Sequence, residues 1–300
     1  MASFQKIDAQ VHLNFFSLEK ALLMMEENHI NSVVIDEWWG PDEEGFRQPN
    51  YRLPSGEVRY LYSYGVDAAV RYPSRFAYTA WVDWRDPQID KVVEFVKDNP
   101  HQVCLRVTIS PQRREDIALA DGLYHPLFSA AQRHGVPMMI CLPRISIERR
   151  LELLLPYLGR WTELKLIIDH CGIFPMSAED IEAGLNVPET INLMHAYAAF
   201  PNVAIKWGHA PLLSRRSAPF EDLIQPLGML IEKFGAQRVM WCSDTTQTNW
   251  HHSWFDSYSY IQDSSELSTS ERSWVLGESC RSILDWPPKS SVGGASNVLS

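Results

Sequence analysis

The sequence predicts an α/β fold, a (β/α)8 TIM barrel with a long loop insertion after its second strand. Eight short apolar runs are each followed by a helical pattern, which is the order of a barrel built from βα units. A length of 300 residues with 45% hydrophobic content suits one large domain. An open doubly wound sheet is the alternative, but no Gly-x-Gly-x-x-Gly follows the first run. We expect one domain over residues 1–288 and a disordered tail over 289–300, which is rich in Ser, Gly and Asn.

The expected strands are short runs dominated by apolar and β-branched residues. The sixth is almost wholly apolar, as is usual for a strand covered on both faces. The eight runs cover residues 4–13, 32–36, 76–81, 103–108, 136–142, 164–169, 203–207 and 238–243.

The expected helices between them carry capping and stop signals. Ser17 is a suitable N-cap for the first, and Asp86-Pro87 is a cap followed by a favoured first helical residue. A helix over 220–234 contains Pro226, which predicts a kink. Further helices are expected over 124–134, 147–158 and 191–200, and a closing helix begins with a capping box at Ser268 and Glu271.

The pattern breaks down between residues 38 and 75. This stretch is rich in Gly, Pro, Tyr and Arg and is about twice as long as a usual loop. We expect a structureless connection that acts as a lid over a site.

Charge and cysteine content restrict the class of protein. Asp and Glu number 37 against 27 Lys and Arg, and an acidic chain without basic runs argues against nucleic-acid or anionic-membrane binding. Five cysteines, odd in number and mostly within apolar runs, predict buried thiols rather than disulfides. No apolar run approaches the roughly 20 residues of a membrane span, and the first strand starts too early for a signal peptide. These features predict a cytoplasmic protein.

Polar residues recur where the expected strands end. Barrel active sites lie at the carboxyl ends of the strands, and a polar group in an apolar strand end is costly unless it has a partner. The residues at these positions are Asp8, Gln10, His12, Asp36, Glu37, Arg106, Arg144, Asp169, His170, Lys206, His209 and Asp244.

Three motifs within this ring carry a family resemblance. They are IDAQVHL over residues 7–13, LIIDHCG over 166–172 and VMWCSD over 239–244. In this order the chain resembles the amidohydrolase-related (amidohydrolase 2) branch of the amidohydrolase superfamily, which holds lactonases and aromatic-acid decarboxylases. The resemblance covers about residues 4–287. The family's first motif is Asp-x-His-x-His, and Gln10 stands here in place of its first histidine.

The resemblance implies that His12, His170 and Asp244 are catalytic, as metal ligands or as groups that polarise the substrate. Imidazole and carboxylate suit Zn or Mn, and Asp244 would be the general base that activates water. An amide is a weaker ligand than imidazole, so Gln10 leaves two outcomes open. Either the site binds metal loosely through His12, His170 and Asp244, or it has none, and His12 and His170 then polarise the substrate carbonyl while Asp244 activates water. Gln10 is in addition a candidate for substrate recognition. The structural alternatives are a core histidine at His170 and a helix cap at Asp244.

Cations in the ring suggest the class of substrate. Arg106 and Lys206 lie in apolar strands, and Arg144 follows Pro143. Together they predict a small molecule that bears a carboxylate. Aromatic residues, Trp39 among them, would suit a flat ring or lactone; the others are Trp38, Tyr51, Trp81, Trp207 and Trp250. The alternative for each cation is an internal ion pair with Asp36, Glu37 or Asp169.

The run His251-His252 resembles a metal-binding pair. Adjacent side chains on a loop or helix point apart, so the sequence favours a loop or interface over a shared metal. The oligomeric state, including a homodimer, stays open.

Three functions follow from these observations. The first is a hydrolase in which water, activated by Asp244, attacks the carbonyl of a lactone or related cyclic acid derivative held by His12 and His170. The second is a metal-dependent non-oxidative decarboxylase of an aromatic or unsaturated acid, which Gln10 disfavours. The third is a non-catalytic barrel that serves as a binding protein.

Overall fold

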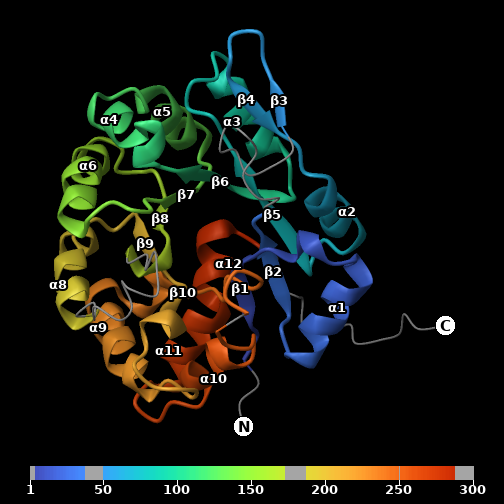
Figure 1. The fold of residues 1–300 in the computed structure, drawn as a ribbon, viewed down its shortest axis with the longest axis vertical. Helices are drawn as coiled ribbons and strands as arrows, with labels where there is room; N and C mark the ends of the chain where they lie inside the picture. The colour runs from blue at the N-terminus through green and yellow to red at the C-terminus, as the bar shows by residue number, and fades with distance from the viewer. Residues whose placement is uncertain (1–3, 38–49, 173–186, 250, 288–300) are drawn as a thin grey trace.

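The computed structural model describes residues 4–37, 50–172, 187–249 and 251–287. Eight parallel strands follow one another around a barrel in sequence order, and helices surround them (Figure 1). The predicted barrel is therefore confirmed. Its strands are β1 (Ile7–Val11), β2 (Ser32–Ile35), β5 (Phe76–Trp81), β6 (Gln102–Thr108), β7 (Met138–Cys141), β8 (Leu166–Ile168), β9 (Val203–Trp207) and β10 (Val239–Trp241).

The first and last strands are joined at the carboxyl end of the barrel. The amide of Asp244 donates to the carbonyl of Gln10 at 3.0 Å. The Asp8 carboxylate accepts from the amide of Ser243 at 2.9 Å and from Nε1 of Trp254 at 2.7 Å. Asp8 therefore fastens β1 to the segment that follows β10, and we call this junction the barrel seam.

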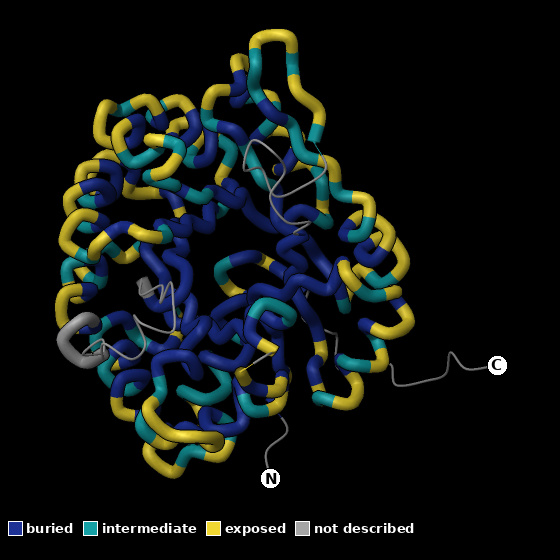
Figure 2. The backbone as a smooth tube through the Cα atoms, in the orientation of Figure 1, coloured by how far each residue is buried: buried dark blue, intermediate teal, exposed yellow. Residues whose placement is uncertain are grey.

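The helices cover the outside of the strands, and their exposed residues face away from the barrel (Figure 2). No helix among the described residues is long and apolar enough to cross a membrane. The helices are α1 (Leu18–Glu27), α2 (Ser63–Arg71), α3 (Ile89–Asp98), α4 (Glu115–Ala120), α5 (His125–His134), α6 (Ile147–Arg160), α8 (Val187–Ala198), α9 (Ile224–Phe234), α10 (Asp256–Gln262), α11 (Thr269–Ser273) and α12 (Ser279–Leu284).

Two predicted helix starts are confirmed and two are corrected. The side chain of Ser17 caps α1, and Ser268 caps α11 in a capping box. The helix predicted at Asp86-Pro87 begins later, at Ile89, because the Asp86 carboxylate first accepts the amide of Gln88 in a turn. No kink is needed at Pro226, because α9 begins at Ile224 and a first-turn residue needs no N–H donor.

The insertion after β2 contains regular structure, so the expectation of a structureless loop is wrong for residues 50–71. An antiparallel hairpin, β3 (Asn50–Arg52) and β4 (Val58–Tyr60), projects from the barrel, and α2 follows it (Figure 1). Asp83 accepts the amide of Val58 at 3.1 Å, and Arg59 pairs with Asp86 at 2.8 Å. These contacts fix the hairpin to the loop after β5. Residues 38–49 of the insertion, and the tail 289–300, lie outside the described residues.

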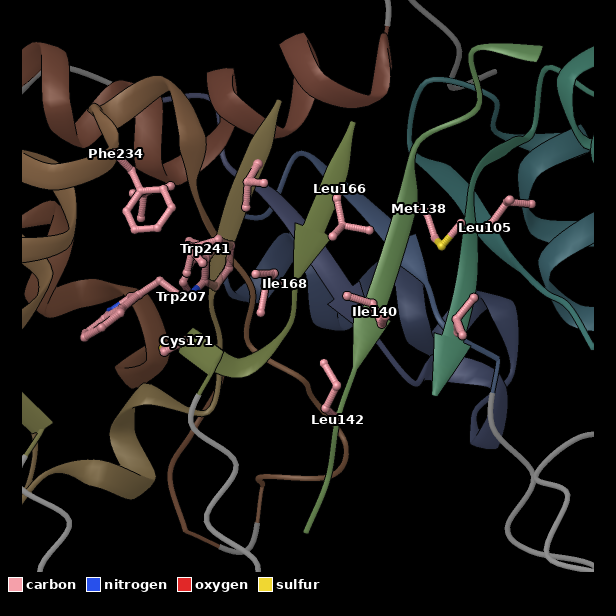
Figure 3. Packing of buried hydrophobic residues seen from close by; sticks show 14 of the residues in the cluster. Leu105, Met138, Ile140, Leu142, Leu166, Ile168, Cys171, Trp207, Phe234 and Trp241 are labelled. Atoms are coloured by element: carbon pink, nitrogen blue, oxygen red, sulfur yellow. The ribbon is translucent and has the colours of Figure 1, made fainter. Parts of the chain in front are cut away.

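The strands divide their side chains between two cores, as the two-residue period of a strand requires. In β7, Met138 and Ile140 face the helices while Met139 faces the barrel interior. Figure 3 shows the outer core, where Trp207 and Trp241 lie near Phe234 of α9. Trp207 was expected at the mouth of the barrel and instead lies in this core, with its Nε1 donating to the hydroxyl of Tyr260 at 2.6 Å.

The C-terminal segment closes the other end of the barrel. Cys280, Leu284 and Trp286 pack against the inward residues of the strands. At Gly277, just before α12, an added Cβ would lie 2.2 Å from the carbonyl oxygen of Gln5, so this approach requires glycine. All five cysteines are buried thiols outside any disulfide, as predicted.

Candidate active site

Polar side chains from seven of the eight barrel strands meet at the carboxyl end, and all of them are buried or nearly so. The strands deliver Gln10, Trp81, Arg106 and Lys206 directly, and the residues just after strands deliver the rest. The cluster consists of Gln10, His12, Asp36, Trp81, Arg106, Asp169, His170, Lys206, His209 and Asp244.

Three residues of this cluster turn the chain sharply where a strand ends. His170, His209 and Asp244 have φ values of 53°, 57° and 56°, a left-handed region that side chains other than glycine rarely adopt. Such backbone conformations gather at functional sites, where the surrounding structure holds them.

Asp244 is the centre of the cluster. Its Oδ1 accepts from Nε2 of Gln10 at 3.1 Å and contacts Nε2 of His12 at 2.7 Å. Its Oδ2 contacts Nε2 of His209 and lies 3.9 Å from Nδ1 of His170. Burial alone would raise the pKa of Asp244, but the neighbouring His209 and His12 outweigh it and hold the pKa well below its usual value. Asp244 is therefore a carboxylate that stays ionised.

The surroundings of His12 and His170 shift their pKa values in opposite directions. His12 lies between two acceptors, because its Nδ1 is 2.6 Å from the carbonyl of Asp36 and its Nε2 contacts Asp244. Both ring nitrogens can donate only in the imidazolium form. Burial lowers the pKa of His12, but the charge of Asp244 outweighs it and the net direction is upward. Burial and the neighbouring His209 hold the pKa of His170 well below its usual value. The rings of His170 and His209 stack with centroids 4.1 Å apart.

Two of the three cations expected to bind substrate are paired inside the protein. Arg106 contacts Asp36 through Nε at 3.2 Å and Asp169 through its terminal nitrogen. Lys206 lies 3.0 Å from the other oxygen of Asp169. For Arg106 and Lys206 the structure thus has the internal ion pairs that the sequence analysis gave as the alternative. An unpaired buried charge would be costly.

Gln10 connects these ion pairs to Asp244. Its Oε1 accepts from Nζ of Lys206 at 2.7 Å, and its Nε2 donates to Asp36 at 3.2 Å as well as to Asp244. One amide thus joins the carboxylates of Asp36 and Asp244 to the ammonium of Lys206 through hydrogen bonds.

The remaining residues of the predicted ring lie elsewhere. Asp8 belongs to the barrel seam, where burial raises its pKa to about 6. The Glu37 carboxylate accepts the amides of Tyr64 and Gly65 at 3.3 and 2.9 Å, at the start of α2. Arg144 is exposed on the loop after β7, and Trp39 lies outside the described residues.

The adjacent histidines lie in a turn after β10, in a loop as predicted. The expectation that the two side chains point apart is wrong, because the Nδ1 atoms of His251 and His252 are 3.3 Å from each other. Phe220 packs against both rings, with centroids 6.3 and 6.0 Å away, and brings them together.

Some members of the cluster have roles that the sequence did not reveal. His209 was placed in the ring but not in the centre, although its position two residues after β9 is a signal for it. The hydroxyl of Thr79 donates to Asp36 at 3.3 Å. The two-residue alternation of β5 is the sequence signal for the direction of this side chain. Cys141, which ends β7, lies with Asp169 and His170 in a group whose ligand atoms are close together.

One group of residues fits a divalent metal. Ligand atoms of His170, His209 and Asp244 all lie within 4.8 Å of one another, and two imidazoles with one carboxylate form a usual donor set for Zn. Gln10 does not fit, because the group it directs toward Asp244 is an N–H donor.

Comparisons with known proteins agree with this architecture. The family model described as amidohydrolase matches residues 56–285. A search of curated protein sequences returned no match. Among solved structures, a zinc-bound amidohydrolase from Burkholderia multivorans is 18% identical, with a TM-score of 0.68 over 94% of this chain and 100% of that one.

Two further structures have named activities. The 5-carboxyvanillate decarboxylase from Sphingomonas paucimobilis is 14% identical, with a TM-score of 0.64 over 94% of this chain and 98% of that one. A probable 2-pyrone-4,6-dicarboxylic acid hydrolase from Acinetobacter baumannii is 13% identical, with a TM-score of 0.62 over 95% and 100%. At these identities the structures establish a shared fold, and the family match covers most of the chain. The chain therefore belongs to the amidohydrolase family, whose members are enzymes that include hydrolases and decarboxylases.

Proposed function

We propose that this enzyme is a hydrolase that opens a lactone or a related cyclic carboxylic acid derivative. The observation that carries the proposal is the environment of Asp244, an ionised carboxylate held between His12 and His209 at the mouth of the barrel. A carboxylate so placed can take a proton from water, and the adjacent imidazoles can share that proton or donate one to an oxygen.

The proposed reaction uses these groups in order. Water loses a proton to Asp244, and the hydroxide attacks the carbonyl carbon. Negative charge then develops on the carbonyl oxygen, where His170 stabilises it by a hydrogen bond. His12, whose ring nitrogens contact the carbonyl of Asp36 and the carboxylate of Asp244, adds its positive charge nearby. The tetrahedral intermediate collapses, the ring C–O bond breaks, and the leaving oxygen takes up the proton.

A metal would be held by His170, His209 and Asp244. When bound there, it would polarise the carbonyl and lower the pKa of a bound water.

We propose a substrate that bears a carboxylate. Arg106 and Lys206 are engaged by Asp36 and Asp169, so among the cations singled out from the sequence, Arg144 is the one exposed to solvent. Arg144→Met should raise KM for carboxylate-bearing lactones with little change in kcat and leave neutral lactones unaffected. An equal effect on both kinds of lactone would remove Arg144 from substrate binding.

The likeness to the 5-carboxyvanillate decarboxylase makes decarboxylation of an aromatic acid the second candidate. Here Asp244 or a histidine would protonate the ring carbon that loses carbon dioxide. Release of carbon dioxide from carboxylated aromatics, with no turnover of any lactone, would favour this reaction.

The test of the first proposal is a screen of lactones followed by substitution of Asp244. Asp244→Asn keeps the shape of the side chain but removes its charge, and turnover should fall by about 10²–10⁴-fold. Asp98→Asn, on the exposed end of α3, is the matched control and should retain full activity. Circular dichroism would check that both variants fold. Full activity in Asp244→Asn would disprove the mechanism.

A further inference from the structure

We propose that Gln10 and Lys206 act as one unit that lowers the affinity of this active site for divalent metals. The unit joins β1 to β9 beneath Asp244. The inference concerns the same site as the proposed function, but it does not depend on which reaction the site performs.

Three charged neighbours set the orientation of the Gln10 amide. An ammonium has only donors, so Lys206, whose Nζ is 2.7 Å from the amide, must face its oxygen. Carboxylates have only acceptors, so Asp36 and Asp244 must face its nitrogen. A reversed amide would place donor against donor and acceptor against acceptor. The charges around Gln10 therefore fix its orientation, and its N–H group points at Asp244.

In this orientation Gln10 directs no ligand atom at the candidate metal site. Its one ligand atom, Oε1, is taken by Lys206, and an amide N–H₂ offers no lone pair to a cation. His170, His209 and Asp244 would then bind a metal without a ligand from position 10.

Lys206 is itself fixed in place. Its side chain is fully buried, and Nζ is bound to Asp169 at 3.0 Å as well as to Gln10. A metal ligand at position 10 would therefore have an ammonium as its immediate neighbour. This cation would occupy the lone pair of the ligand and repel the metal. Position 10 alone thus does not decide metal affinity, and Lys206 must change with it.

The experiment is a double-mutant cycle with zinc affinity as the readout. The wild type, Gln10→His, Lys206→Met and the double variant would be titrated with Zn²⁺ against a chromophoric chelator. We expect each single variant to bind zinc within about tenfold of the wild type. The double variant should bind about 100-fold more tightly than either, since the gain requires both changes.

A control tests whether loss of any lysine has the same effect. Lys165 precedes β8, is exposed, and donates to the carbonyl of Ile283 at 3.2 Å. Gln10→His combined with Lys165→Met should bind zinc as weakly as Gln10→His alone.

Two results would overturn the inference. Tight zinc binding by Gln10→His alone would show that Lys206 has no role, and a double variant no tighter than the wild type would show that position 10 does not face the metal. Thermal melts would identify unfolded variants, and Lys206→Gln, which keeps a donor for Asp169, would replace Lys206→Met in that case. Because zinc affinity is measured without turnover, failure of the lactone assay would leave this result standing.

Discussion

Gly208 lies between Lys206 and His209, where the chain leaves β9 and enters the site. A Cβ at this position would lie 2.3 Å from Sγ of Cys242 and 3.5 Å from Nδ1 of His170. The first distance is far below any real carbon contact, so Gly208→Ala must displace Cys242 or the backbone of β9. We expect the free energy of unfolding to fall by about 1–3 kcal/mol, the usual cost of overpacking a core.

Urea denaturation followed by tryptophan fluorescence would measure this loss. Cys242→Ala removes the sulfur that the new methyl group meets, so Gly208→Ala combined with Cys242→Ala should be more stable than Gly208→Ala alone. Gly159, exposed near the end of α6, has no atom within 4 Å of an added Cβ. Gly159→Ala should therefore stabilise the protein by about 0.5–1 kcal/mol. If Gly208→Ala were as stable as Gly159→Ala, the argument from close packing would be refuted.

Three further predictions concern charge and burial. Arg106→Met should reduce the free energy of unfolding by about 3–5 kcal/mol, because it leaves buried carboxylates without their partner. Arg216→Ala breaks an exposed pair with Glu221 and should reduce it by less than about 1 kcal/mol. Equal urea midpoints for the two variants would contradict this prediction. Burial raises the pKa of Asp8 to about 6, so the folded state binds a proton that the unfolded chain has already released, and this group makes stability fall as pH rises from about 4 to about 6. Asp8→Asn should flatten that part of the stability profile, and an unchanged slope would assign it to another group. All five thiols should react with a disulfide reagent in denaturant but not in the native protein; rapid reaction of native thiols would count against their burial.

The sequence predicts which residues lie in the site better than it predicts which of them contact one another. The two-residue alternation of strands, together with the end of each apolar run, places Arg106 and Lys206 at the mouth of the barrel. The same alternation directs Trp207, the neighbour of Lys206, outward into the core. Partners could not be predicted in this way, because Arg106 reaches Asp36 and Asp169, which come from strands on either side of it around the barrel. The distances between such partners depend on how the strands close into a barrel, and no local sequence pattern records that closure.

The hairpin and the capping role of Glu37 were missed for a different reason. Strands of three residues, such as β3 and β4, are too short to show an alternating pattern. Their stability comes from contacts distant in sequence, such as the bond from Val58 to Asp83. Glu37 likewise follows a strand as a catalytic acid would, and only the fold shows that it receives the amides that begin α2.

The barrel seam has a consequence for how activity arises during synthesis. Gln10 and His12 leave the ribosome early, and their partner Asp244 is added 234 and 232 residues after them. Until the last strand joins the first, the groups of the active site are spread over separate segments and no partial barrel contains them all. Under the proposed mechanism, activity therefore requires that the segment after β10 has joined β1, so turnover measured during refolding would report the closing of the barrel seam.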